Sequence, residues 1–89
     1  MDIEKFLSEE PDASNKAISA LWWQGKGDWD KAHKLVQSGD ENNHWVHAHL
    51  HRVEGDASNA AHWYGRANKP VCESDLKEEW LAILTALSE

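Results

Sequence analysis

The fold of this chain is decided by one stretch, HWVHAHLHRVEGDASNAAHWYGRA, which runs from His44 to Ala67. Apolar residues in its first half recur at spacings of three and four, which places them on one side of a helix: Trp45, Val46, Leu50 and Val53. Gly55 then favours the left-handed backbone that ends a helix, and Asp56 can cap the next one. The stretch therefore predicts two helices joined by a tight turn.

The second of these helices carries a family resemblance. The Gly55-Asp56 turn is followed by small, aromatic and small residues, in an order that resembles the second helix of tetratricopeptide-like repeats: Ala60, Tyr64 and Ala67. The Trp63-Tyr64 pair and Pro70, which closes the helix, are similar to the shorter Sel-type variants. The resemblance covers mainly residues 44–70 and implies a helical hairpin, but it implies no particular activity.

The first helix of the stretch departs from this repeat pattern. Histidines stand where the repeats have large aromatic or aliphatic residues, at His44, His47 and His51, whereas Ala48 occupies the expected small position. The segment WVHAHLHRVEGD is also similar to one in small uncharacterised proteins, from which no activity carries over. The histidines therefore need an interpretation of their own.

A degenerate copy of the hairpin is expected over residues 16–39. The Gly27-Asp28 turn aligns with Gly55-Asp56, and the apolar positions around the two turns then correspond. The first helix of this copy is expected from Asp12 or Ser14 to Lys26, and the second, capped by Asp28, is expected to end at Gly39. Two hairpins of this kind would stack, because one hairpin alone cannot bury its apolar face.

Both ends of the chain predict further helices. A short helix is expected from Asp2 to Glu9, before Pro11. A longer one, capped by Ser74 or Asp75 and ending at Leu87, has an apolar stripe with Glu78 and Glu79 expected outside it. The stripe consists of Leu76, Trp80, Ile83, Leu84 and Leu87. The predicted fold is a single all-α domain over residues 1–89, in which two stacked tetratricopeptide-like hairpins carry a short N-terminal helix and a C-terminal amphipathic capping helix.

Composition sets limits on partners and location. The net charge is −7 over 89 residues, and its excess of acidic side chains lies at the two ends. Because no basic cluster is present, nucleic acid is not expected as a partner. No apolar run is long enough for a membrane span or typical of a signal peptide, and the single Cys72 cannot form an internal disulfide. A cytoplasmic protein, monomeric or homodimeric, is expected.

The histidines suggest a metal site. On a helix, His44, His47 and His51 lie on adjacent turns of one side, whereas His49 points elsewhere. Three imidazoles could hold zinc or a similar divalent ion if the facing helix added a ligand, for which His62 or a carboxylate is the candidate. The alternative is structural: the repeat pattern places the same histidines in the hairpin interface, where they would only pack and form hydrogen bonds.

The repeat pattern and the apolar pattern place different sides of this helix inward. The repeat pattern buries the three histidines, and the apolar spacing buries the opposite side, around Leu50. A central helix that is covered on both sides would satisfy both patterns.

The leading functional hypothesis is a protein-interaction module that holds a peptide or a partner helix. Its groove would be lined by Trp23, His47, His51, Arg52 and Tyr64. The alternative is a metal- or small-ligand-binding protein, possibly hydrolytic, that uses the histidine-rich helix face. An enzyme is the less favoured class and no catalytic residue is assigned, because the sequence has no Gly-rich phosphate loop, nucleophile elbow or Cys-pair metal motif.

Overall fold

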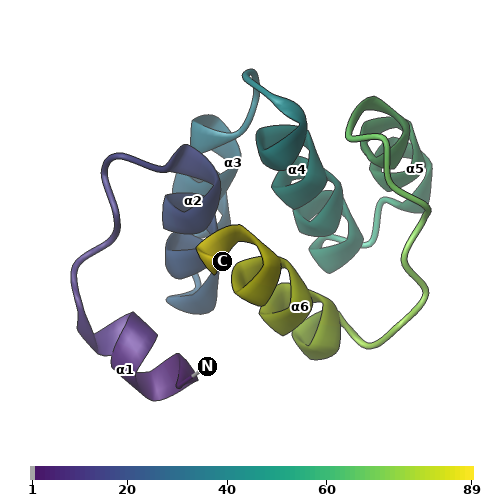
Figure 1. Cartoon of the computed structure of the whole chain (residues 1–89). Coiled ribbons are helices and arrows are strands. Elements are labelled where there is room, and N and C mark those ends of the chain that lie inside the picture. Colours follow the sequence, from purple (N-terminus) through teal and green to yellow (C-terminus); the bar gives the residue numbers. More distant parts are fainter. Residues whose placement is uncertain (1) are drawn as a thin grey trace.

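The computed structural model describes residues 2–89. All regular secondary structure within this range is helical (Figure 1). The six helices are α1 (Ile3–Ser8), α2 (Lys16–Gly25), α3 (Trp29–Leu35), α4 (Glu41–Val53), α5 (Ala57–Arg66) and α6 (Leu76–Ser88). The predicted all-α class is therefore confirmed.

Each helix begins at a short polar side chain that accepts a hydrogen bond from a backbone amide of the first turn. Asp28, Asp56 and Asp75 cap α3, α5 and α6, as predicted. The start of α2 differs from the prediction, because Asn15 is the capping residue. Asp12 instead accepts from the backbone amide of Ser14 at 3.0 Å, in a local turn that precedes the helix.

The two Gly-Asp turns have the same geometry, as their alignment in the sequence suggests. Gly27 and Gly55 have φ values of 89° and 85°, in the left-handed region that glycine tolerates best. In both turns the glycine amide donates to the carbonyl three residues earlier at 3.0 Å, and the aspartate amide donates to the carbonyl five residues earlier at 2.9 Å. These bonds satisfy carbonyls that the ends of α2 and α4 would otherwise leave free.

Helix α3 ends at Leu35, earlier than the predicted Gly39. The amide of Val36 donates to the carbonyl of His33 at 3.1 Å, which tightens the last turn. Gly39 has a φ of 121°, and the Asn43 side chain packs against it while donating to the Ser38 carbonyl at 2.9 Å. The segment after Val36 therefore turns back toward α4 instead of continuing the helix.

Helix α4 lies at the centre of the fold. It pairs with α5 in one hairpin, packs against α2 and α3 of the other, and contacts α6 on its remaining side (Figure 1). All residues from Val46 to His51 are buried, and three of them are histidines. The main core joins α2, α3, α4 and α6, and a smaller cluster of Ala48, Ala60 and Tyr64 joins α4 to α5. The prediction of a central helix covered on both sides is confirmed.

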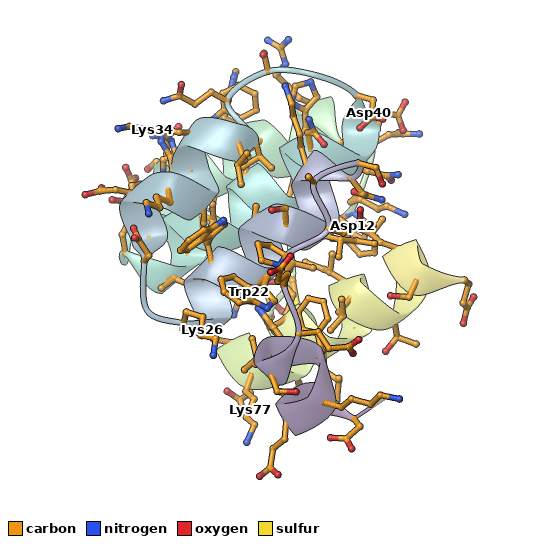
Figure 2. All side chains as sticks on the ribbon, turned by 90° about the vertical axis from the view of Figure 1, so that its left-hand side faces the viewer. Asp12, Trp22, Lys26, Lys34, Asp40 and Lys77 are labelled. Carbon is orange, nitrogen blue, oxygen red and sulfur yellow. The ribbon has the colours of Figure 1, made fainter. Side chains whose placement is uncertain are left out.

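Indole N–H groups connect helices that are distant in sequence. Trp80 donates to the Leu21 carbonyl at 2.9 Å, and Trp29 donates to the Leu50 carbonyl at 2.8 Å. Trp22 is half-buried and donates to the Glu9 carbonyl at 2.9 Å, which attaches the segment after α1 (Figure 2). These bonds pair the polar edge of each indole while its rings pack against apolar neighbours.

Candidate metal centre

Three imidazoles meet between α3 and α4. His33 comes from α3, and His47 and His51 lie one turn apart on α4. One ring nitrogen of each lies within 4.8 Å of those of the other two. Nitrogens bound to a single tetrahedral zinc ion at about 2.0–2.1 Å lie roughly 3.4 Å apart, so the three nitrogens would have to move closer together to bind one ion. The group could therefore hold a divalent metal ion.

Two indoles enclose these imidazoles. Trp29 stacks on His33, with ring centroids 4.6 Å apart and planes inclined by 12°. Trp63 of α5 stacks on His47 from the other side, with centroids 3.9 Å apart and an angle of 21°. The Trp29 indole is itself held in place, because its N–H donates a hydrogen bond to the Leu50 carbonyl. The rings are thus oriented by packing from α3, α4 and α5.

Two of the three histidines have a polar partner just beyond the end of their own helix. The Nδ1 atom of His51 lies 2.5 Å from Oε1 of Glu54, and in the tautomer that donates this hydrogen bond from Nδ1 the lone pair is on Nε2. The Nδ1 atom of His33 lies 3.3 Å from the amide nitrogen of Gln37. The Nδ1 atom of His47 is buried and finds no hydrogen-bond partner within residues 2–89.

The environment favours neutral rings. Burial, followed by the proximity of His33 and His51, lowers the pKa of His47 to about 4 from an ordinary value of 6.5. Burial and the proximity of His51 also lower the pKa of His33. Near neutral pH these rings keep the lone pairs that metal coordination requires.

The other histidines proposed as metal ligands are elsewhere. The His44 ring packs against Trp63, at a centroid distance of 5.2 Å, and does not join the group of three. His62 is exposed on α5 and meets Trp63 edge-on. His33 was not proposed from the sequence. Its position four residues after Trp29, beside the predicted inner face of its helix, is the signal that could have indicated it.

A second polar cluster is buried on the opposite side of α4, around Glu79 of α6. Its Oε1 atom lies 2.7 Å from Nδ1 of His49 and 2.7 Å from a guanidinium nitrogen of Arg52, and its Oε2 accepts from the Tyr64 hydroxyl. Glu79 is 4% exposed, so the prediction that it faces solvent is wrong. Three donors from α4 and α5 compensate for the hydration that this carboxylate loses.

The charge of Glu79 is stabilised by these partners. Burial alone would raise its pKa, but the hydrogen bonds from His49, Tyr64 and Arg52 outweigh burial and hold the pKa at about 2. Burial and the adjacent carboxylate also raise the pKa of the Tyr64 hydroxyl, which remains a donor. Glu79 therefore keeps its negative charge between the Arg52 guanidinium and the His49 imidazole.

The five residues of the predicted peptide groove contact different parts of the fold. Arg52 and Tyr64 contact Glu79, whereas His47 and His51 belong to the imidazole group on the other side of α4. Trp23 is half-buried against the main core, with the Lys31 ammonium 4.3 Å from its ring centroid. Four pockets of the described surface, with volumes from about 230 to 490 Å³, are all lined by other residues.

The helices are short, and even α4 and α6 have only 13 residues each. No helix within residues 2–89 combines the length and the apolar character needed to cross a bilayer.

The chain as a whole matches no family model, no curated protein and no solved structure.

Proposed function

We propose that this protein binds a divalent transition-metal ion, with zinc as the reference ion, through His33, His47 and His51. The observation that carries the proposal is the convergence of three imidazole nitrogens within 4.8 Å of one another on two packed helices. Imidazole ligands suit zinc, copper and nickel better than they suit magnesium or calcium, which prefer oxygen. The depressed pKa of His47 supports the proposal, because protons do not compete with a metal there at neutral pH.

Glu54 supports the same proposal from outside the ligand set. A histidine that binds a metal through one nitrogen usually donates the other N–H to a carboxylate or a carbonyl, which fixes the ring and raises its basicity. The 2.5 Å contact between His51 and Glu54 has this arrangement. Asp56 lies near both residues, but it caps α5 by accepting from the Asn59 amide at 3.2 Å. Its recruitment as a ligand would therefore cost the helix its cap.

Three protein ligands would leave one coordination position of a tetrahedral ion for water or a small ligand. This pattern is typical of catalytic zinc sites, whereas structural sites usually have four protein ligands. An ion with an open position lowers the pKa of its bound water toward 7, which is the chemistry a hydrolytic activity would require. A site of this type is expected to bind zinc reversibly and to bind small anions or imidazole at the open position.

The test is a calorimetric titration of metal-stripped, untagged protein with zinc chloride. We expect one ion per chain, and we expect His33→Gln and His47→Gln to weaken binding at least tenfold, as each removes a ligand. His44→Gln and His62→Gln are the matched controls, because both change a histidine outside the group and should bind zinc like the parent. Absence of stoichiometric binding, or full binding by the His33 variant, would overturn the proposal.

Binding of a peptide or a partner helix is a separate hypothesis. It lacks a supporting contact, since Arg52 and Tyr64 are engaged with the buried Glu79 carboxylate and His47 is enclosed by Trp63. The metal hypothesis is preferred because its residues already converge.

A further inference from the structure

A pocket lies away from the histidines, where α1 meets the last turn of α2, the end of α4 and the first turn of α6. Its volume is about 320 Å³. Its walls are mainly carbon and include Ile3, Leu7, Gly25, Val53, Leu76 and Trp80. This volume is at the lower limit of pockets that hold small molecules, so a single substituted ring or a short chain fits its size.

Gly25 gives this pocket its shape. A Cβ atom added at Gly25 would lie 2.8 Å from a methyl carbon of Leu7 and 3.2 Å from the Trp80 ring. The close approach of these two side chains therefore depends on a residue without a side chain. Helix α1, which supplies Leu7, has no fully buried residue, so this wall can move to admit a ligand.

The Gln24 amide supplies a polar group in a wall that is otherwise mostly carbon. Its Oε1 atom is buried and has no hydrogen-bond partner within residues 2–89. Rotation about the last side-chain bond would present either the oxygen or the NH₂ group to the pocket. Whichever of these groups faces the pocket, a ligand hydroxyl can donate to the oxygen or accept from the NH₂ group.

A charged ligand would find no buried counter-charge here. Lys77 is the one charged residue of the lining, and it is exposed at the edge, next to α1 (Figure 2). Transfer of an ion into such a pocket would remove its hydration without replacing it. A neutral molecule avoids this cost.

We propose that this pocket binds a small neutral molecule with an apolar body and one hydroxyl group, such as a phenol, through apolar contacts and a hydrogen bond to Gln24. The site is independent of the histidine group. Phenol and toluene are a suitable pair of probes, because they have nearly the same shape and differ in the hydroxyl.

The test is an NMR titration of the full chain with phenol and, separately, with toluene. Phenol should bind roughly 3- to 10-fold more tightly, the factor that one neutral hydrogen bond provides, with shifts at Leu7 and Trp80. Gln24→Leu should remove this preference and leave toluene binding intact. Equal binding of the two probes by the parent, or a phenol preference that survives Gln24→Leu, would overturn the proposal. So would tighter binding of benzylamine or benzoate, the charged counterparts.

Two further variants locate the binding. Val53→Phe should fill the pocket and abolish binding of both probes, whereas Val71→Phe makes the same change at an exposed position outside the lining and should have no effect. A circular dichroism melt of each variant shows whether it is folded. If folded Val53→Phe binds phenol like the parent, the pocket is not the binding site.

Discussion

His49 and Glu79 are buried partners thirty residues apart in sequence, with 2.7 Å between Nδ1 and Oε1. The His49 side chain has no exposed surface and that of Glu79 is 3% exposed, so the His49 ring depends on Glu79 for its hydrogen bond. Arg52 and Tyr64 complete the set of donors around the carboxylate. Helix α6 is therefore held against α4 and α5 by a polar contact as well as by its apolar stripe.

Replacement of Glu79 by Gln is expected to destabilise the protein by about 3–5 kcal/mol, the typical cost of breaking a buried ion pair. The amide removes the negative charge beside Arg52, and its NH₂ group cannot accept from the donors that it faces, either His49 and Arg52 or Tyr64. Chemical denaturation followed by circular dichroism measures the loss. Glu78→Gln, at the exposed neighbouring position, is the matched control and should change stability by less than about 0.5 kcal/mol. Similar results for both variants would contradict a stabilising role of the cluster.

Stability is expected to fall on mild acidification because of His47. Its pKa is about 4 in the folded protein and 6.5 as the ordinary value, so the unfolded chain binds the proton more readily. The contribution of the neutral ring is complete above about pH 6.5 and is lost as pH falls toward 4. Between pH 7.5 and 5.5 the expected loss is roughly 1 kcal/mol, measured by denaturation at the two values.

The variant His47→Gln checks the source of this acid sensitivity. It should lose less stability than the parent between pH 7.5 and 5.5, because the titrating ring is gone, whereas His62→Gln should behave like the parent. A parent protein that is equally stable at both pH values would show that His47 does not titrate in this way.

Glu79 affects stability at lower pH than His47 does. Its pKa is lowered from 4.5 to about 2 by folding, so its contribution to stability is lost as the pH falls below about 4.5.

Gly55→Ala is expected to cost about 1–2 kcal/mol. The φ of 85° is unfavourable for a residue with a Cβ atom, although nothing lies within 4 Å of the position where that atom would be. Gly65→Ala is the matched control, because this glycine is inside α5 and its Cβ position is equally open. That substitution should stabilise the protein by up to about 1 kcal/mol. The thermal midpoint should therefore fall for Gly55→Ala and rise for Gly65→Ala. Because neither added methyl group meets a neighbour, this difference reports on the backbone conformation and not on packing.

Deletion of residues 74–89 is expected to abolish cooperative unfolding. The segment contributes Trp80, Ile83 and Leu84 to the main core and Glu79 to the polar cluster. Burial of each large apolar side chain stabilises by roughly 1.5–3 kcal/mol, and their removal would expose the facing sides of α2 and α4. A truncated chain with a sharp thermal transition near that of the parent would show that α6 is dispensable.

The helices and their turns were predictable because their signals are local. Apolar residues at spacings of three and four, the two Gly-Asp turns and the capping aspartates act within one or two turns of chain. The early end of α3 was missed because it depends on the contact between Asn43 and the Ser38–Gly39 segment, which forms only when α4 is in place. The stacking of the helices followed from the need to cover both sides of α4.

The candidate site was only partly predictable, because its parts come from different helices. His47 and His51 were identified from their spacing on one helix, whereas His33 joins them through the packing of α3 on α4. Glu79 was assigned to the surface by its charge and by its neighbour Glu78. Its burial depends on donors from α4 and α5, at separations of 15 to 30 residues, and helical periodicity does not report such distant pairs.

Helix α4 acts as a partition. His47 faces the imidazole group on one side, and His49, two residues later, faces the Glu79 carboxylate on the other. The same residue type thus has two unrelated electrostatic surroundings within a single turn, separated by the backbone of the helix. An engineer could replace the imidazole group with apolar side chains while leaving the anchor of α6 unchanged.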